Sequence, residues 1–527
     1  MKTVLPKGLF ILLLSSIVRG LSAQVIIPGD YAREYYDLLL FQDTSLNQPI
    51  VQYPSIVTQY HTDGEPSWNI WGENFKLDDK KSNSSLYVVD PVLRVNYNSL
   101  IPMSYNDGAQ WNGRGANLFL SGGVAGRVGI LQYAFVPNIQ VSQNKDFFIP
   151  ETPSGRNEYA YPFDSRIDWV QKYGAGTYTH FDMGQSEIRL IYKNATIGVS
   201  TENFRWGVTQ FSPILMSYNA PGFPHIDIGT NVPVETKIGR LEGRIFWGQL
   251  VESDYFDSDP DNETGYISGM HIGYQPSFFP QLNVGLNRVL NTRWSDGDLS
   301  FKDAFALFTK TKGKGAQKND EYDQMLSVYF DFAFREVGFR TYLEFARNDF
   351  PGSVSELFQN PDRSRAFTLG LMKTFELGNE RLLSVLFEST TLSTNQLQRL
   401  NTGNPTYYVH PWSVRGFTNR GQIMGAGIGP GSNSNFVRVD LYQPKGKWSL
   451  TLTRVRFNDD YFVRAFNGQS DFPTDFERTI RLDYVGFFNK LTINPNFSYT
   501  YRNNWYYVDE NEATNIMAGV NLSYRID

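Results

Sequence analysis

The sequence predicts an all-β protein, a transmembrane antiparallel β-barrel of about 18 strands that follows a short helical N-terminal segment. Three observations support this fold class. From residue 86 to the C-terminus, stretches of about ten residues alternate apolar and polar side chains. Short turns and long polar loops alternate between these stretches. After residue 23, no stretch approaches the roughly 20 apolar residues of a membrane-spanning helix, which excludes a helical inner-membrane protein.

The clearest alternation lies in the neighbouring stretches 326–335 and 338–347. Side chains alternate sides along a strand, so Tyr329, Asp331 and Arg335 share one face of the first stretch. The other face is entirely apolar and consists of Leu326, Val328, Phe330, Phe332 and Phe334. A strand of a soluble sandwich would also alternate, but so aromatic a face opposite a charged one suits lipid outside and water inside.

Residues 1–23 are predicted to be a secretory signal peptide. Lys2 and Lys7 precede an apolar run over 9–18, which is too short to span a membrane. Residues 21–23 then offer small side chains for cleavage. Its removal leaves 45 basic and 54 acidic residues, a net charge of −9 that argues against nucleic acid as a partner. The chain has no cysteine, which excludes lipid anchoring through a thiol, disulfides and thiol chemistry.

Residues 24–85 differ from the rest and are predicted to form a short, partly helical periplasmic segment. The stretch 31–41 repeats apolar residues at helical spacing, and Pro49 and Pro54 then end the pattern. The barrel is assigned to residues 86–527.

Eighteen strands are expected along that barrel, an even number as in bacterial barrels. They are 86–98, 115–124, 128–142, 185–193, 195–205, 226–238, 241–251, 266–276, 281–293, 322–335, 338–347, 365–376, 380–391, 434–443, 447–458, 476–487, 490–502 and 514–527. Tight turns are expected at 193–195, 239–240, 336–338, 376–379, 443–446 and Asn489. Because short turns are periplasmic and long loops external in this class, both termini are expected in the periplasm.

Side chains of both signs are predicted to face the lumen. They are Glu187 with Arg189, Glu242 with Arg244, Asp331 with Arg335, Arg340 with Glu344, and Arg438 with Asp440. One interpretation is a polar channel or glycan track. The other, which we favour, is a set of cross-strand ion pairs that fill the barrel interior.

No motif indicates catalysis, a metal ion or a cofactor. The five histidines lack ligand spacing, no G-x-S-x-G occurs, and the glycine-rich run 425–431 lacks dinucleotide-binding spacing. We therefore expect no enzymatic activity and no cofactor.

The predicted external loops combine aromatic rings with amides and guanidinium groups, which suits glycan binding. Aromatic faces pack on sugar C–H surfaces, and the polar groups bond hydroxyls and carboxylates. An interfacial aromatic girdle and loop packing would account for about half of these residues. The candidate glycan-binding residues are Trp111, Asn112, Arg205, Trp206, Asn219, Trp412, Arg415, Asn419, Arg420 and Trp505.

Several motifs resemble the capsule-assembly Wzi family. They are Tyr105–Gly115, Pro137–Asn144, Arg205–Pro221, Gly243–Leu250, Arg415–Gly425 and Gly427–Ser432. The resemblance implies an eighteen-stranded outer-membrane barrel of a Gram-negative bacterium that binds capsular polysaccharide or exopolysaccharide and helps hold a capsule on the cell. It implies a lectin-like role without catalysis. Residues 24–85 are shorter than the helical N-terminal bundle known in that family.

A porin or glycan-export channel is the alternative function, and an open lumen would favour it. Outer-membrane lipid is expected around the barrel, and the polysaccharide-export machinery is a candidate partner.

Overall fold

The computed structural model describes residues 29–43, 68–77, 84–102, 105–153, 155–257, 263–294, 304–308, 322–348, 364–394, 406–410, 415–466 and 473–526. The predicted signal peptide, residues 1–23, lies outside the described residues.

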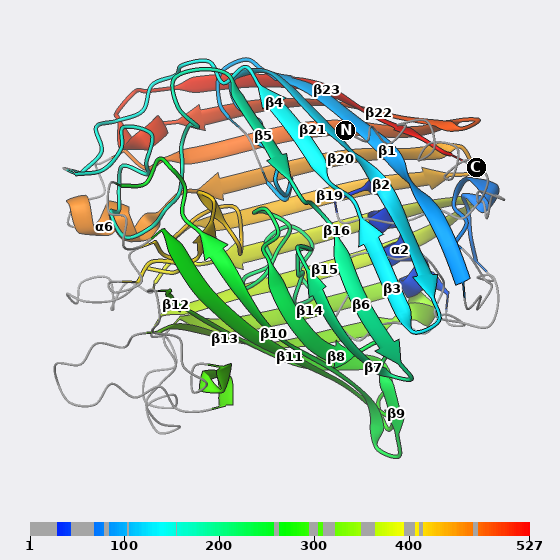
Figure 1. The fold of residues 1–527 in the computed structure, drawn as a ribbon. Helices are drawn as coiled ribbons and strands as arrows, with labels where there is room; N and C mark the ends of the chain where they lie inside the picture. Colours follow the sequence, from blue (N-terminus) through cyan, green and yellow to red (C-terminus); the bar gives the residue numbers. More distant parts are fainter. Residues whose placement is uncertain are drawn as a thin grey trace, which may run out of the picture.

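The described chain is mostly strand (Figure 1). The barrel strands are β1 (Ser84–Asn98), β2 (Gly115–Val128), β3 (Leu131–Phe135), β4 (Asn138–Ser142), β5 (Tyr178–Asp182), β6 (Glu187–Tyr192), β7 (Ala195–Ser200), β8 (His225–Thr230), β9 (Val234–Thr236), β10 (Gly239–Val251), β11 (Thr264–Pro276), β12 (Leu282–Arg293), β13 (Asp323–Phe334), β14 (Phe339–Asn348), β15 (Arg365–Gly378), β16 (Arg381–Thr391), β19 (Asn433–Gln443), β20 (Gly446–Arg456), β21 (Phe476–Phe488), β22 (Leu491–Asn503) and β23 (Ala513–Tyr524). The other elements are α2 (Tyr31–Gln42), α6 (Asp459–Phe466), the 3₁₀ turns η1 (Gly72–Asn74), η3 (Ala306–Phe308), η4 (Arg335–Val337) and η5 (Trp505–Tyr507), and a small hairpin of β17 (Thr418–Asn419) and β18 (Gln422–Ile423).

The sheet closes on itself as an antiparallel barrel of 18 strand positions, which confirms the predicted fold class. The first and last strands meet at the seam, where Val92 to Asn98 of β1 pair with Ser523 to Met517 of β23. Three positions hold a broken strand: β3 with β4, β5 with β6, and β8 with β9. The first break falls at Pro137, because proline has no N–H to donate to a neighbouring strand.

All short turns lie at one end of the barrel and all long loops at the other. We call these the turn end and the loop end. The turns expected at 193–195, 336–338, 376–379, 443–446 and Asn489 are confirmed within about two residues. Both β1 and β23 reach their outer ends beside these turns, so the two ends of the barrel chain share the turn end (Figure 1).

Several expectations about strand limits are wrong. The strand expected over 115–124 continues to Val128, so the turn before β3 lies at 129–130. Gly239 and Arg240 begin β10, so the turn before that strand is Lys237–Ile238. The strand expected over 195–205 ends at Ser200, because the chain then leaves the wall and folds into the barrel interior.

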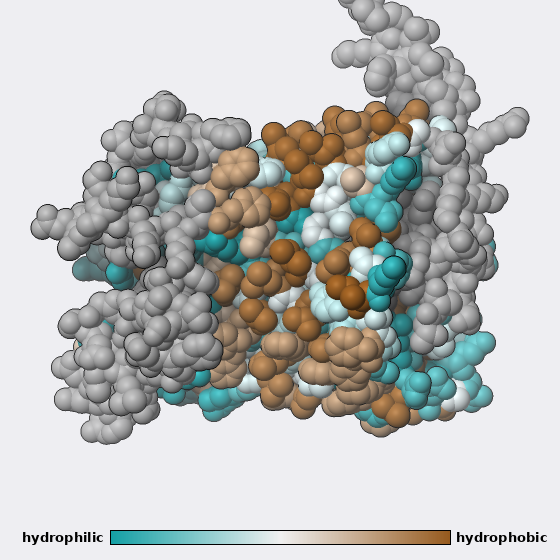
Figure 2. Space-filling model, turned by 90° about the horizontal axis from the view of Figure 1, so that it is seen from below, coloured by the Kyte–Doolittle hydropathy of each residue, from teal (hydrophilic) through white to brown (hydrophobic). Residues whose placement is uncertain are grey.

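Outward-facing side chains form an apolar belt around the barrel, and Figure 2 shows one side of it. Among its exposed members are Val95, Leu118, Ile139, Phe181, Ile188, Ile228, Ile272, Phe330, Leu369, Leu450, Ile480 and Phe497. A continuous apolar surface of this kind suits the hydrocarbon of a bilayer, and the backbone of a closed barrel needs no partner there.

An apolar core fills part of the interior. The long loops after β7 and β16 supply Ile214, Tyr408 and Ile423, which pack on inward residues of the wall such as Phe246 and Ile267. These loops are therefore a plug inside the loop end of the barrel, which we call the loop plug. External loops were expected at these positions, and the structure instead folds parts of them into the barrel interior.

Several inward charges elsewhere form ion pairs, some within one strand and some between strands, as favoured from the sequence. Arg189 lies 2.8 Å from Glu187 and 2.7 Å from Asp227, and Arg340 lies 2.7 Å from Asp331. Arg438 lies 3.0 Å from Asp440. Arg340 thus pairs with Asp331, where the sequence had suggested Glu344 as its neighbour.

The helix α2 confirms the predicted N-terminal helix and packs inside the turn end of the barrel (Figure 1). The rings of its Tyr35 and of Trp71 stack with centroids 3.7 Å apart, and both belong to a cluster that includes Leu382 and Tyr442 of the wall. Among the described residues, no helix combines the length and apolar character needed to cross a membrane.

Candidate functional site

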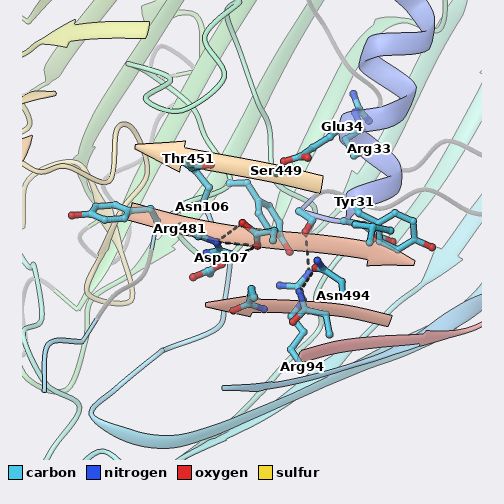
Figure 3. A pocket seen from close by; sticks show the side chains of 18 of the residues that line it. Tyr31, Arg33, Glu34, Arg94, Asn106, Asp107, Ser449, Thr451, Arg481 and Asn494 are labelled. Carbon is cyan, nitrogen blue, oxygen red and sulfur yellow. Dashed lines mark hydrogen bonds and ion pairs between the residues drawn. The ribbon is translucent and has the colours of Figure 1, made fainter. Parts of the chain in front are cut away.

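A polar cavity of about 370 Å³ lies inside the barrel between α2, strands β19 to β23 and β1, and the loops after β1 and β7 (Figure 3). We call it the inner cavity. Its floor near the helix is charged: Glu34 of α2 accepts a hydrogen bond from Arg438 at 3.0 Å and contacts Lys447. Burial disfavours the charged carboxylate, but the attraction of Arg438 and Lys447 outweighs it and lowers the pKa of Glu34 to about 2.

Other charges of the inner cavity are also paired. Arg481 donates to Asp483 at 2.7 Å, and Asp37 accepts from Arg33 at 3.2 Å and from Arg205 at 3.5 Å. These pairs fix the guanidinium groups against the wall and the helix, so the cavity is lined by compensated charge.

The wall of the inner cavity formed by β20, β21 and β22 is polar, and its two charged residues, Arg481 and Asp483 of β21, are paired with each other. Inward positions of β20 and β22 alternate with outward apolar ones and carry hydroxyl or amide groups. These side chains include Ser449, Thr451, Thr453, Asn494, Asn496 and Ser498.

A second cavity, of about 100 Å³, lies at the loop end, and we call it the aromatic cavity. Its rings include Trp505, which stacks on Phe147 with centroids 5.7 Å apart, and Trp169. Arg502 donates to both carboxylate oxygens of Asp475, at 2.6 and 2.7 Å, and its guanidinium lies 4.0 Å from the centroid of Phe457. Ring faces and polar groups therefore meet in one hollow.

Five of the ten predicted glycan-binding residues line one of the two cavities. Trp111, Asn219 and Trp505 line the aromatic cavity, and Asn112 and Arg205 line the inner cavity. They come from loops that are distant in the sequence, which is why the motif order alone did not place them together.

The other predicted residues hold the plug together. Trp206 is 1% exposed and packs on Phe246, with ring centroids 5.3 Å apart. The Asn419 side chain bonds backbone atoms of Val251 and Pro221. Trp206 and Asn419 have no free face for a ligand in this structure.

Two arginines of the plug also sit among protein groups. Arg415 is 4% exposed beside Asp168 and Glu252, and burial lowers its pKa to about 10. Arg420 contacts His180 at 2.6 Å and Asp182 at 3.5 Å. The tenth candidate, Trp412, lies outside the described residues.

Sequence reasoning missed several residues that the structure places in the cavities. Arg502 and Asp475 sit at strand ends next to predicted loops, and Arg94 and Arg481 are inward residues of β1 and β21. Alternation could have marked Arg94 and Arg481 as inward, but it could not show which inward residues face open space. In the described part of the chain, no group of three or more histidine, aspartate or glutamate residues is arranged to hold a metal ion.

Comparison with known proteins gives one strong family match. The family model described as capsule assembly protein Wzi matches residues 101–471. Among solved structures, the fold resembles Wzi of Escherichia coli, described as an outer membrane protein involved in group 1 capsule assembly and a carbohydrate-binding β-barrel. The TM-score is 0.61 at 13% identity, covering 96% of this chain and 100% of that one.

Two proteins of Acinetobacter baumannii are more distant. OccAB4 gives a TM-score of 0.40 at 10% identity and OccAB3 gives 0.41 at 12%, and they cover 84% of this chain and 98% and 99% of their own. No curated protein sequence matches significantly. Since the family model spans more than half of the chain, this protein belongs to the Wzi family of capsule-assembly proteins.

Proposed function

We propose that this protein is an outer-membrane attachment protein that binds capsular polysaccharide or exopolysaccharide and helps hold it at the cell surface, without catalysis. Family membership and the fold shared with a carbohydrate-binding barrel support this role. The observation that carries it is the aromatic cavity, in which Trp111, Trp169 and Trp505 meet the amide of Asn219 and the guanidinium of Arg502 at the loop end.

The chemistry of this cavity suits a sugar ring. Aromatic faces offer an apolar surface to axial C–H groups, while amides and a fixed guanidinium bond hydroxyl or carboxylate oxygens. Trp169 and Gln171 are only partly buried, so they can meet a polymer that arrives from the loop end.

The test compares polymer retention among variants. We expect Trp169→Ala combined with Gln171→Ala to reduce cell-bound polysaccharide and increase polymer shed into the medium. Each lost contact is expected to cost about 1–2 kcal/mol, and the double change is needed because a polymer engages many copies at once. Trp294→Ala is the matched control, since Trp294 lies at the loop end but lines neither cavity. Normal retention in the double variant would contradict the proposal.

The proposal also sets the orientation of the barrel. The loop end faces outward, both termini are periplasmic, lipid of the outer membrane surrounds the belt, and the export machinery is a partner at the periplasmic end. An epitope tag inserted after Asp509, an exposed loop-end residue, should be detected on intact cells. A tag after the exposed turn residue Glu380 should be detected only after permeabilisation. The opposite pattern would invert the orientation.

A further inference from the structure

We propose that the inner cavity is a second saccharide site, which holds one or two neutral sugar units of the same polymer and lies next to the aromatic cavity across Tyr105. This inference rests on the proposed function and extends it from the loop end into the barrel. Its volume of about 370 Å³ falls within the range of roughly 300–1,000 Å³ that small-molecule sites occupy.

Several hydroxyl and amide groups in the wall of the inner cavity have no hydrogen-bond partner in the described part of the protein. Among the described residues, the side chains of Thr451, Thr453 and Asn496 have no hydrogen-bond partner, and neither has the buried hydroxyl of Ser498. Polar groups inside a protein are normally satisfied by protein or by water. These four groups lie on β20 and β22, on either side of the paired Arg481 and Asp483 of β21, so a hydroxyl-rich ligand can bond several of them at once.

Aromatic faces complete the set of groups that a sugar ring requires. Phe211 and Phe436 stack with centroids 4.5 Å apart, and Tyr31 and Tyr218 also line the cavity. The amides of Asn106 and Gln110, in the loop after β1, also line the cavity. The cavity therefore offers apolar and polar surfaces together, as a sugar does.

The charge balance argues for a neutral ligand. The lining has six basic and five acidic side chains, and most are paired with each other as described above. Arg94 is the main exception, because its hydrogen bonds go to neutral acceptors, the Gly29 carbonyl at 3.1 Å and Gln110 at 3.5 Å. Asp107 lines the same hollow and accepts a bond from Asn112 at 2.7 Å. A strongly anionic group would thus meet little net positive charge.

Tyr105 connects the two cavities. It is the aromatic residue that lines both, and its hydroxyl donates to Glu477 at 3.3 Å. Its ring centroid lies 5.8 Å from that of Phe211, which lines the inner cavity. Movement of this one side chain would join the two hollows, so a chain end bound among the aromatic rings could reach the inner wall.

The natural absence of cysteine allows a direct test. Thr451→Cys places a single thiol in the inner cavity, Trp169→Cys places one in the aromatic cavity, and Thr514→Cys places one on the outward face of β23 as the control. The full-length proteins in detergent are treated with methyl methanethiosulfonate. The probes are oligosaccharides of a few units, prepared by partial hydrolysis of the polymer shed by the host strain and separated into neutral and anionic fractions.

We expect the neutral fraction to slow modification of Thr451→Cys about tenfold when present at about ten times its dissociation constant, and to leave Thr514→Cys unchanged. Tyr105→Ala should speed modification of Thr451→Cys in the absence of sugar. Thr453→Val combined with Asn496→Leu should weaken the protection, because it removes unsatisfied polar groups of the wall.

The outcomes separate this inference from the proposed function. Protection of Trp169→Cys alone would overturn the inner site and leave surface binding intact. Protection of Thr451→Cys by the anionic fraction alone would overturn the assignment of a neutral ligand. A Thr451 thiol that stays unreactive even with Tyr105→Ala would show a sealed cavity and overturn the inference. No protection at any position, together with no polymer binding, would overturn the proposed function itself.

Discussion

At the scale of single residues, glycines make room for tyrosines inside the barrel wall. Gly285 of β12 is directly opposite Tyr329 of β13, and Gly370 of β15 is opposite Tyr342 of β14. Both tyrosines are fully buried, with exposures of 0% and 1%. Each ring lies across the neighbouring glycine, so the sheet packs an inward aromatic side chain where a second side chain would not fit.

Gly285→Ala should therefore destabilise the barrel. A Cβ at this position would overlap the ring and hydroxyl of Tyr329, and overpacking of a filled interior costs about 1–3 kcal/mol. The expected result is a lower unfolding temperature in detergent, measured by the heat needed to change electrophoretic migration. Gly176→Ala is the control, because a Cβ there meets nothing within 4 Å. Equal unfolding temperatures for the two variants would contradict this packing.

The fate of individual tryptophans shows what the sequence could and could not predict. Trp206 and Trp505 both stand between strands at the loop end, yet Trp206 packs in the loop plug and Trp505 lines the aromatic cavity. The difference depends on which wall residues lie opposite each loop, such as Phe246 beside Trp206. Residue type predicts that an aromatic side chain will be buried, but only the tertiary arrangement decides whether it is buried by protein or borders a cavity.

At the scale of elements, α2 is held in the barrel by charge as well as by its aromatic cluster. Glu34→Gln should weaken this docking by about 1–2 kcal/mol, since hydrogen bonds to charged groups are lost but the site is partly open to the inner cavity. Hydrogen exchange of residues 31–42 should become faster. Glu73→Gln is the control, because the Glu73 side chain is 90% exposed.

The pH dependence of the same contact has a definite sign. Because the pKa of Glu34 is lowered from its ordinary 4.5 to about 2, its contribution is complete above about 4.5 and is lost as the pH falls towards 2. Exchange of α2 in the unmodified protein should rise across that window, and the Glu34→Gln variant should lack this component. Identical pH profiles would contradict the role of Glu34.

Strand alternation predicted the wall because lipid on one side and a polar interior on the other impose a period of two on every strand. Alternation alone did not reveal the broken strands, since β3 and β4 together continue one alternating pattern across Pro137, and only the proline itself marks that break. Loop paths were not predictable either. The segment 304–308 folds over the outside of the wall, where the Trp247 indole donates to the Ala304 carbonyl at 2.9 Å. Such contacts join distant parts of the chain and leave no local periodic signal.

At the scale of the whole molecule, a different part of the chain fills each end of the lumen. The turn end holds α2, anchored by the ion pairs of Glu34 and by the stack of Tyr35 on Trp71. The loop end holds the loop plug, an apolar core shared between loops and wall. The inner cavity lies between them. An attachment protein gains from this arrangement because the filled interior fixes the loops that meet the polymer.

This arrangement predicts how the protein conducts ions. In planar bilayers the full-length protein should show little or no steady conductance, because the apolar core that the loop plug shares with the wall narrows the lumen and disfavours ions. Deletion of residues 31–42 should still not give a wide channel, since the loop plug remains. Only removal of plug residues as well, for example by shortening the loop over 206–216, should open a pore of porin size. Single-channel recordings of the three proteins provide the measurement. A large conductance after deletion of α2 alone would mean that the loop plug does not close the barrel, and it would favour the porin or glycan-export alternative, in which α2 gates the channel.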